Sequence, residues 1–228
     1  MEVEVGITKL RVSHEGGKLT FQYPAFRGNY GNVANAINND NLKRPNSSET
    51  ASLVDDAFKN SDGKYESEII KILNDTLLWE FTGNLYLPKL NEKIDNGVIL
   101  EYNPKIENGK LIMDKNSLIK RLKENDSNVK FVPFGFKTGK QNLIELQKNP
   151  YIVARYGKEG AEKIAEIASK YKNEPYVYSF DSVNEEKVRM SALFRDWGSV
   201  NRLIVLGNYW FSDYDGHAFG VDNTKKNE

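Results

Sequence analysis

The spacing of apolar residues changes repeatedly along this chain, and the order of those changes constrains the fold more than any other feature. A helix places apolar residues three or four apart on one face, whereas a half-buried strand alternates them. Strand-like runs come first, around the Glu15-Gly16-Gly17 turn, and helices follow, the first opened by the capping-box pair Asn46 and Glu49. The segments predicted for this half are strands 3–12, 18–23, 77–81, 85–87, 98–102 and 111–113, the last two joined across 108–109, and helices 46–58 and after 62–63.

The second half continues without a regular alternation of strand and helix. Its clearest helix is 159–172, where Ala161, Ile164 and Ala168 recur at helical spacing. A parallel sheet built from strand–helix–strand units would need that alternation, so we expect an α+β fold. We expect one domain over 1–228, with a possible N-terminal elaboration over 1–88. The other segments predicted here are helices 117–123 and 142–148, the latter stopped by Pro150, and strands 176–180, 202–206 and 218–221.

Charge and cysteine content exclude several classes of function. Lys plus Arg and Asp plus Glu both number 32, so no net field attracts nucleic acid or an anionic membrane. No cysteine is present, which excludes thiol nucleophiles, cysteine-ligated zinc and disulfides. No segment approaches the roughly 20 apolar residues of a spanning helix. We therefore expect no nucleic-acid partner and no membrane insertion by this chain.

The motifs of catalysis and cofactor binding are weak in this sequence. Residues 135–141 resemble a phosphate-binding loop, but the glycines are one residue too close, and Gln141 stands where the magnesium-binding Ser or Thr would be. His14 and His217 are the only histidines, so a three-histidine metal site is excluded. We predict no catalytic residues, no metal and no cofactor.

One stretch near the end of the chain stands out by its composition. Residues 208–217 contain four aromatic residues together with Asn, Ser, Asp and Gly, a mixture typical of antibody-like binding loops. Aromatic side chains offer a large amphipathic contact area at small entropic cost, and short polar residues adapt to the partner. Apolar runs at 203–206 and 218–221 predict that this recognition loop is held between two buried strands.

The alternative interpretation is that these aromatic residues fill a core. Asp213 and Asp215 argue against it, because the sequence around them offers no Lys or Arg, and a buried unpaired carboxylate costs several kcal/mol. We therefore expect a partly exposed aromatic patch, which usually marks an interaction site.

The chain from Phe194 to Val221 resembles the variable region of proteins diversified by diversity-generating retroelements. The match consists of Phe194-Arg195-Asp196-Trp197-Gly198-Ser199-Val200-Asn201-Arg202, the apolar run and aromatic loop after it, and Ala218-Phe219-Gly220-Val221, where the family usually has Gly-Phe-Arg. Adenine-directed mutagenesis of AAY codons in that family cannot produce Lys, Glu, Gln, Met or Trp. Residues 195–217 contain no Lys, Glu, Gln or Met, while Trp210 requires a fixed position or another template codon.

The resemblance implies a C-type lectin fold with short antiparallel strands, flanking helices and long loops, in the branch similar to formylglycine-generating enzymes and closest to archaeal variable proteins. It implies a ligand-binding protein with a variable region at 195–221 that recognises a protein or a cell-surface component. A location at the cell surface or outside the cell fits that role, although the first residues lack a signal-peptide pattern. The enzymatic relatives need cysteine or more histidines than this chain contains.

The resemblance also assigns roles to individual residues. Framework positions would be Trp197, Gly198, Leu203, Val205, Leu206 and Phe219. Ligand contacts would be Asp196, Ser199, Asn201, Asn208, Tyr209, Trp210, Phe211, Ser212, Asp213, Tyr214, Asp215, Gly216 and His217.

Two other functions stay open at this point. An assembly role, in a virion or a surface structure, would bury the 208–217 loop between subunits. A hydrolase of glycans or peptides would use Asp213 or Asp215 with His217 as acid and base, and these groups would have to meet in a deep cleft.

Overall fold

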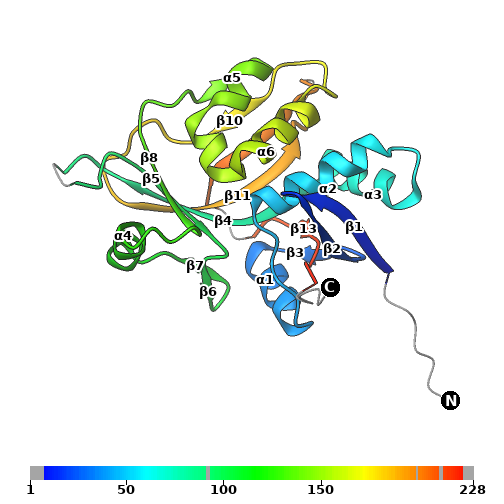
Figure 1. Cartoon of the computed structure of the whole chain (residues 1–228), viewed down its shortest axis with the longest axis horizontal. Helices are drawn as coiled ribbons and strands as arrows, with labels where there is room; N and C mark the ends of the chain where they lie inside the picture. The colour runs from blue at the N-terminus through cyan, green and yellow to red at the C-terminus, as the bar shows by residue number, and fades with distance from the viewer. Residues whose placement is uncertain (1–7, 91–92, 199, 211–212, 223–228) are drawn as a thin grey trace.

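The computed structural model describes residues 8–90, 93–198, 200–210 and 213–222, and its mixture of helices and sheets confirms the α+β class (Figure 1). The helices are α1 (Tyr30–Asn39), α2 (Ser47–Lys59), α3 (Lys64–Asp75), α4 (Lys115–Lys123), α5 (Leu143–Lys148) and α6 (Pro150–Ala168). The strands are β1 (Thr8–His14), β2 (Gly17–Tyr23), β3 (Phe26–Gly28), β4 (Leu77–Leu87), β5 (Gly97–Tyr102), β6 (Lys105–Glu107), β7 (Lys110–Ile112), β8 (Val129–Pro133), β9 (Gly139–Lys140), β10 (Tyr176–Tyr178), β11 (Lys187–Arg195), β12 (Leu203–Tyr209) and β13 (Gly216–Ala218).

One large sheet organises the molecule, in the order β3-β13-β4-β11-β12-β10-β9. β4 is its centre: β11 runs along one edge, while β13 and then β5 pair with the other, and β8 pairs with β5. The strands are not all antiparallel as the resemblance implied, because β13 is parallel to β4 and β10 is parallel to β12. β13 therefore lies between β3 and β4, which places the end of the described chain beside its N-terminal third.

The two faces of the sheet carry separate cores because alternate residues of β4 point to opposite sides. Leu78 and Tyr86 pack on the face covered by α2, α3 and α6, whereas Trp79 and Phe81 pack against α1 on the other face. Figure 1 shows this arrangement, with α6 on one side of the sheet and α1 on the other. We call the first side the helical face and the second the α1 face.

Local sequence signals explain several helix boundaries. Asn46 and Glu49 form the predicted capping box, in which the Asn46 side chain accepts a hydrogen bond from the Glu49 amide at 3.0 Å. Pro150 does end α5, but it also begins α6, where its fixed φ suits the first helical position and Asn149 caps the helix. Only the part of α6 after Gly157, which breaks the helix with a φ of 72°, matches the predicted 159–172 segment.

Some predicted elements differ from the structure in pairing or in extent. The 111–113 segment forms part of β7, which pairs with β6 instead of the 98–102 strand, and that strand, β5, pairs with β4 and β8. The segments at 77–81 and 85–87 form one strand, β4. Sequence spacing missed β8, β11 and α1, and residues 3–7 of the first predicted strand lie outside the described residues.

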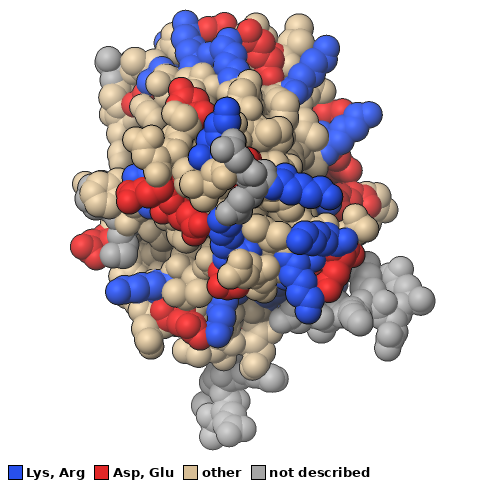
Figure 2. Space-filling model, turned by 90° about the vertical axis from the view of Figure 1, so that its left-hand side faces the viewer, with Lys and Arg blue, Asp and Glu red and all other residues tan. Residues whose placement is uncertain are grey.

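The surface carries no large region of one charge on the side drawn in Figure 2, where Lys and Arg alternate with Asp and Glu. This mixture fits the balanced composition of the whole chain. Within the described part of the chain, no helix combines the length and the apolar character needed to cross a membrane.

Candidate functional site

The predicted recognition loop connects β12 to β13, and its aromatic residues are partly exposed, as expected. The Trp210 side chain is 64% exposed and that of Tyr214 is 56% exposed. Phe211 and Ser212 lie outside the described residues. More than half of the surface of each of these two side chains thus faces solvent, and exposed aromatic surface usually marks an interaction site.

Tyr209 differs from the other two because it anchors the loop to the α1 face. Its half-buried ring lies 5.6 Å from that of Trp79 and 6.4 Å from that of Tyr214, measured between centroids. Trp79 is fully buried, and its indole nitrogen donates a hydrogen bond to the Gly28 carbonyl at 3.1 Å. Burial raises the pKa of Tyr209 to about 12, so its hydroxyl stays protonated. The core interpretation therefore holds in part for Tyr209 and fails for Trp210 and Tyr214.

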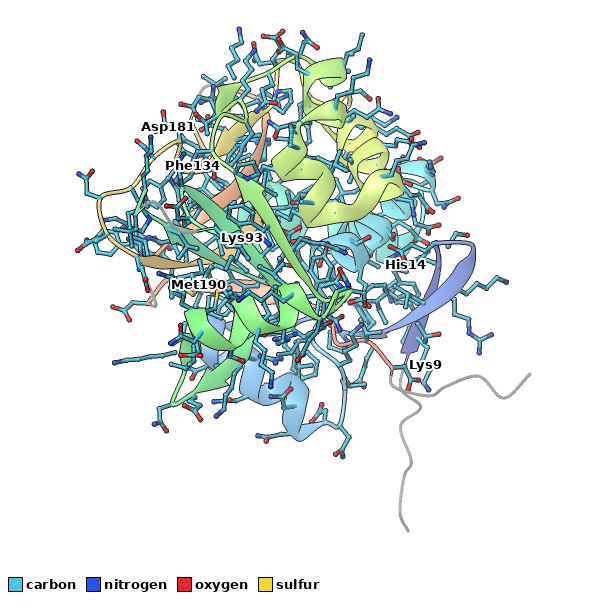
Figure 3. All side chains as sticks on the ribbon, turned by 60° about the vertical axis from the view of Figure 1, so that its left-hand side comes forward. Lys9, His14, Lys93, Phe134, Asp181 and Met190 are labelled. Carbon is cyan, nitrogen blue, oxygen red and sulfur yellow. The ribbon has the colours of Figure 1, made fainter. Side chains whose placement is uncertain are left out.

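A groove of about 330 Å³ opens beside Tyr209 and Trp210. Its other wall is the β6–β7 hairpin and its floor is β11, and it is lined by Gly109, Lys110, Leu111, Val188, Arg189, Met190, Tyr209 and Trp210. Figure 3 places Met190 on the far side of the molecule from His14 and the β1–β2 hairpin. The groove is large enough for a side chain of a partner and lies at the lower end of the roughly 300–1,000 Å³ typical of ligand pockets.

Sequence reasoning missed the hairpin side of this groove. The Asn108-Gly109 turn signal was visible, but nothing in the sequence shows that this turn packs against α1. Two glycines make the approach close enough: a Cβ on Gly31 would lie 2.5 Å from the Gly109 Cα.

One carboxylate of the loop lies near a cation that is distant in the sequence. Asp213 and Asp215 are exposed, as expected. The Asp215 carboxylate lies 3.7 Å from the Arg27 guanidinium, which β3 brings from the other end of the chain through its pairing with β13. Both side chains are mostly exposed, so this ion pair is screened by water and orients the loop weakly.

The predicted contacts that precede β12 in the sequence lie away from the loop. β11 and β12 pair from Arg195 with Leu203 to Met190 with Tyr209, so Asp196 and Trp210 flank opposite ends of β12. Six residue steps at about 3.3 Å each separate those ends by roughly 20 Å. The predicted contacts therefore lie in two separate places, one near each end of β12.

The turn that holds Asp196 is built by internal hydrogen bonds. The Asp196 carboxylate accepts from Arg202 Nε at 2.9 Å and from the Gly198 amide at 3.1 Å. The Asn201 backbone carbonyl accepts a hydrogen bond from the Asn173 amide at 3.0 Å, and its side-chain oxygen is buried. Asp196 thus shapes the turn, Asn201 ties it to the segment after α6, and Ser199 lies outside the described residues.

The predicted framework positions are mostly, but not all, buried. Leu203, Val205, Leu206 and Phe219 are all in the core. Trp197 differs from them, because it is 51% exposed and its ring packs at a tilt against that of Phe194, with 4.8 Å between the centroids.

Gly216 and His217 are not part of the exposed loop surface, contrary to the prediction. Gly216 is buried on the α1 face, where a Cβ would lie 2.6 Å from Trp79 Nε1. The half-buried His217 ring points the other way, towards α3, and its Nδ1 lies 3.0 Å from the Thr76 hydroxyl. Burial lowers the pKa of His217, and the Arg27 charge lowers it further.

A buried polar cluster, which sequence reasoning also missed, fixes the start of the loop from the helical face. Arg155 and Glu80 are fully buried and form an ion pair. Arg155 Nη2 donates to the Leu206 carbonyl at 3.0 Å, and the Tyr86 hydroxyl donates to the Gly207 carbonyl at 2.9 Å. We call Leu206 and Gly207 the loop root.

Gly207 is the point where this cluster contacts β12 most closely. A Cβ added to Gly207 would lie 1.8 Å from the Tyr151 hydroxyl, so no other residue fits without movement. Tyr151 is itself held by a hydrogen bond to Asn84 at 2.7 Å and by one from Arg155 at 3.1 Å. The loop therefore leaves the sheet from a fixed point.

A search for metal-binding groups and comparisons with known proteins do not assign a function to the site. Within the described ranges, no group of three or more His, Asp or Glu side chains could hold a metal ion. No family model matches the chain, and the searches of curated proteins and of solved structures also found no match.

Proposed function

We propose that this chain is a non-enzymatic ligand-binding protein. Its contact surface is the exposed set Trp210, Asp213, Tyr214 and Asp215, anchored by Tyr209 and continued by the neighbouring groove; we call this set the aromatic face. The observation that carries the proposal is the exposure of Trp210 and Tyr214, at 64% and 56%, in a loop that an anchored tyrosine precedes. Large rigid side chains presented in this way are typical of interaction surfaces.

The ligand class follows from the shape and chemistry of the aromatic face. The groove is shallow and holds both cations, Lys110 and Arg189, and apolar side chains, Leu111 and Met190. Such a surface suits a macromolecule that inserts one side chain and lays flat area against the aromatic rings. A protein or a cell-surface component is the proposed target.

The finer proposal is a C-type lectin fold whose aromatic face is diversified by a retroelement. It is supported by the resemblance over 194–221 and by the division between an exposed loop and a fixed loop root. Substitutions at exposed positions usually change stability little, so such a loop can vary without loss of the fold. The proposed variable set is narrower than the sequence suggests, because the side chains of Asp196 and His217 make hydrogen bonds, and Gly216 and the Asn201 side-chain oxygen are buried.

Binding assays with a matched tryptophan control test the function. The double variant Trp210→Ala/Tyr214→Ala and the control Trp197→Ala, at the other end of β12, would be applied by biolayer interferometry to a panel of purified cell-surface proteins and glycans. We expect a target whose binding falls at least about 100-fold in the double variant, as for hot-spot residues, and is unchanged in the control. Equal binding by all three proteins would contradict the proposed surface.

The surrounding DNA tests the retroelement. A near-copy of the coding segment for 195–221, differing at adenines and next to a reverse transcriptase gene, is expected. Its absence would remove diversification from the proposal and leave the binding surface.

The two alternative functions make different demands on the same residues. An assembly role predicts exclusive oligomers that bury Trp210, which size-exclusion chromatography with light scattering detects. A hydrolase would need His217 beside Asp213 or Asp215, but the described contacts direct His217 Nδ1 to Thr76 and Asp215 to Arg27 on an open surface. The acid–base pair is therefore not favoured by this geometry.

A further inference from the structure

A second groove, of about 640 Å³, lies between α3 and the β3–β13 pair. Gly216 and Ala218 point into the α1 core, so His217 between them points to the opposite side of β13, where this groove opens. The groove is lined by Arg27, Lys64, Ser67, Glu68, Lys71, Ile72, Asp75, Thr76 and His217.

Hydrogen bonding assigns the tautomer of His217. The Thr76 hydroxyl lies 3.1 Å from the Ile72 carbonyl, to which only the hydroxyl can donate. Its oxygen is then the acceptor for His217 Nδ1 at 3.0 Å, so Nδ1 carries the proton. The other ring nitrogen, Nε2, makes no hydrogen bond within the described part of the chain and is available to a ligand as an acceptor.

Two lysines of the groove lack an anionic partner. Arg27 pairs with Asp215, whereas neither Lys64 nor Lys71 has an ion-pair partner among the described residues. Of the carboxylates, Glu68 accepts a short hydrogen bond from the Tyr23 hydroxyl, which leaves it less free to bind a lysine. A ligand that brings negative charge would complete this set of contacts.

We propose that this groove binds a phosphate monoester of a hydroxylated small molecule. Lys64, Lys71 and Arg27 would bind the phosphate oxygens, and Glu68 and Asp75 would accept hydrogen bonds from the hydroxyl groups of the ligand. His217 Nε2 would accept the P–OH proton of a monoprotonated phosphate or take up one proton when a dianion binds. This site differs from the aromatic face, and the two adjoin only where Arg27 of the groove pairs with Asp215 of the aromatic face.

Binding at this groove can be followed through the imidazole signal of His217, because the chain contains only two histidines. His14 lies on β1, where its Nδ1 is 2.9 Å from the Ser52 hydroxyl, and it serves as an internal control. NMR titration of both imidazoles would be recorded with glycerol 3-phosphate, inorganic phosphate or glycerol, at constant ionic strength set by chloride. We expect glycerol 3-phosphate to raise the pKa of His217, inorganic phosphate to do so more weakly, and the pKa of His14 to stay unchanged, with glycerol inactive.

Charges that surround His217 must be separated from the ligand effect. Arg27 from β3, Asp215 from the loop and Glu68, Lys64 and Lys71 from α3 all act on this imidazole or its groove. The variant Lys64→Gln/Lys71→Gln is therefore compared with Lys18→Gln/Lys130→Gln, a pair of exposed lysines outside the groove. The first pair should weaken glycerol 3-phosphate binding about tenfold, and the second should leave it unchanged.

Two outcomes would overturn the proposal. One is a His217 pKa that does not respond to glycerol 3-phosphate. The other is an equal response of His14 and His217, or an equal loss of binding in both lysine pairs, either of which would show screening of the whole surface. Because the aromatic face is not altered in these variants, failure here leaves the proposed function untouched.

Discussion

The end of β12 and the loop that follows it differ in how many buried contacts they make. On the helical face, Leu206 and Gly207 meet a buried ion pair and buried tyrosines, and a single Cβ at Gly207 would collide with Tyr151. A few residues later, Trp210 and Tyr214 are more than half exposed. This difference teaches that different residues position the loop and contact a ligand. The loop root is fixed by interactions that do not involve the loop side chains.

The largest expected effect comes from breaking the buried ion pair. Arg155→Leu leaves the Glu80 carboxylate buried without its cation, and we expect a loss of about 3–5 kcal/mol in the free energy of unfolding. Urea denaturation followed by circular dichroism measures it. The double variant Arg155→Leu/Glu80→Leu should recover much of that loss, since both charges are gone. A loss below about 1 kcal/mol in the single variant would contradict a root fixed by this pair.

The next effect tests the close contact at the loop root. Gly207→Ala should lower the free energy of unfolding by about 1–3 kcal/mol because the added methyl overlaps the Tyr151 hydroxyl. The matched control is Gly17→Ala, where the nearest atom would be 3.6 Å away, and it should stay within about 0.5 kcal/mol. Equal effects of the two substitutions would mean that Gly207 is not a point of fixation.

A smaller effect is expected from pH, through the two histidines. Burial lowers the folded-state pKa of both His14 and His217 below the ordinary value of 6.5. The unfolded chain then binds protons that the folded chain does not, so stability is full above pH 6.5 and falls as the pH drops towards the folded-state values. His14→Gln and His217→Gln should each flatten this dependence in thermal unfolding between pH 7.5 and about 5. An unchanged slope would contradict the burial of these rings.

The smallest effects are expected on the aromatic face. Trp210→Ala and Tyr214→Ala should each change the free energy of unfolding by no more than about 0.5 kcal/mol, because their side chains are mostly in water. Tyr209→Ala should cost more, about 1–2 kcal/mol, since its ring packs on Trp79. The same denaturation assay measures all three, and a loss at Trp210 as large as that at Tyr209 would support the core interpretation for the whole loop.

The sequence predicted those parts of the fold and site that depend on neighbours along the chain. The capping box at Asn46 and the partial exposure of Trp210 and Tyr214 are confirmed, because local hydrogen bonding and the nearby aspartates decide them. The parts decided by distant segments were missed or wrong. Arg27 reaches Asp215 through the pairing of β3 with β13, and the β6–β7 hairpin is held beside the groove by contacts with α1 and with β11.

Pairing and side-chain alternation within the sheet also explain why predicted contacts that are close in sequence lie apart in the structure. Asp196 and Trp210 are close in sequence, but an extended strand separates them by its whole length, and alternation along β13 turns His217 away from the loop. Arg155 was not recognised because its partner Glu80 lies 75 residues away in the sequence.

The most direct test of the central claim compares two randomised libraries of equal size, displayed on yeast and scored for protease resistance. In one, the exposed loop positions Trp210, Asp213, Tyr214 and Asp215 are varied; in the other, the positions varied are the buried Leu203, Val205, Gly207 and Phe219. We predict that most clones of the first library remain resistant and that few of the second do. An equal loss of resistance in both libraries would contradict a fixed root that carries a freely variable contact surface.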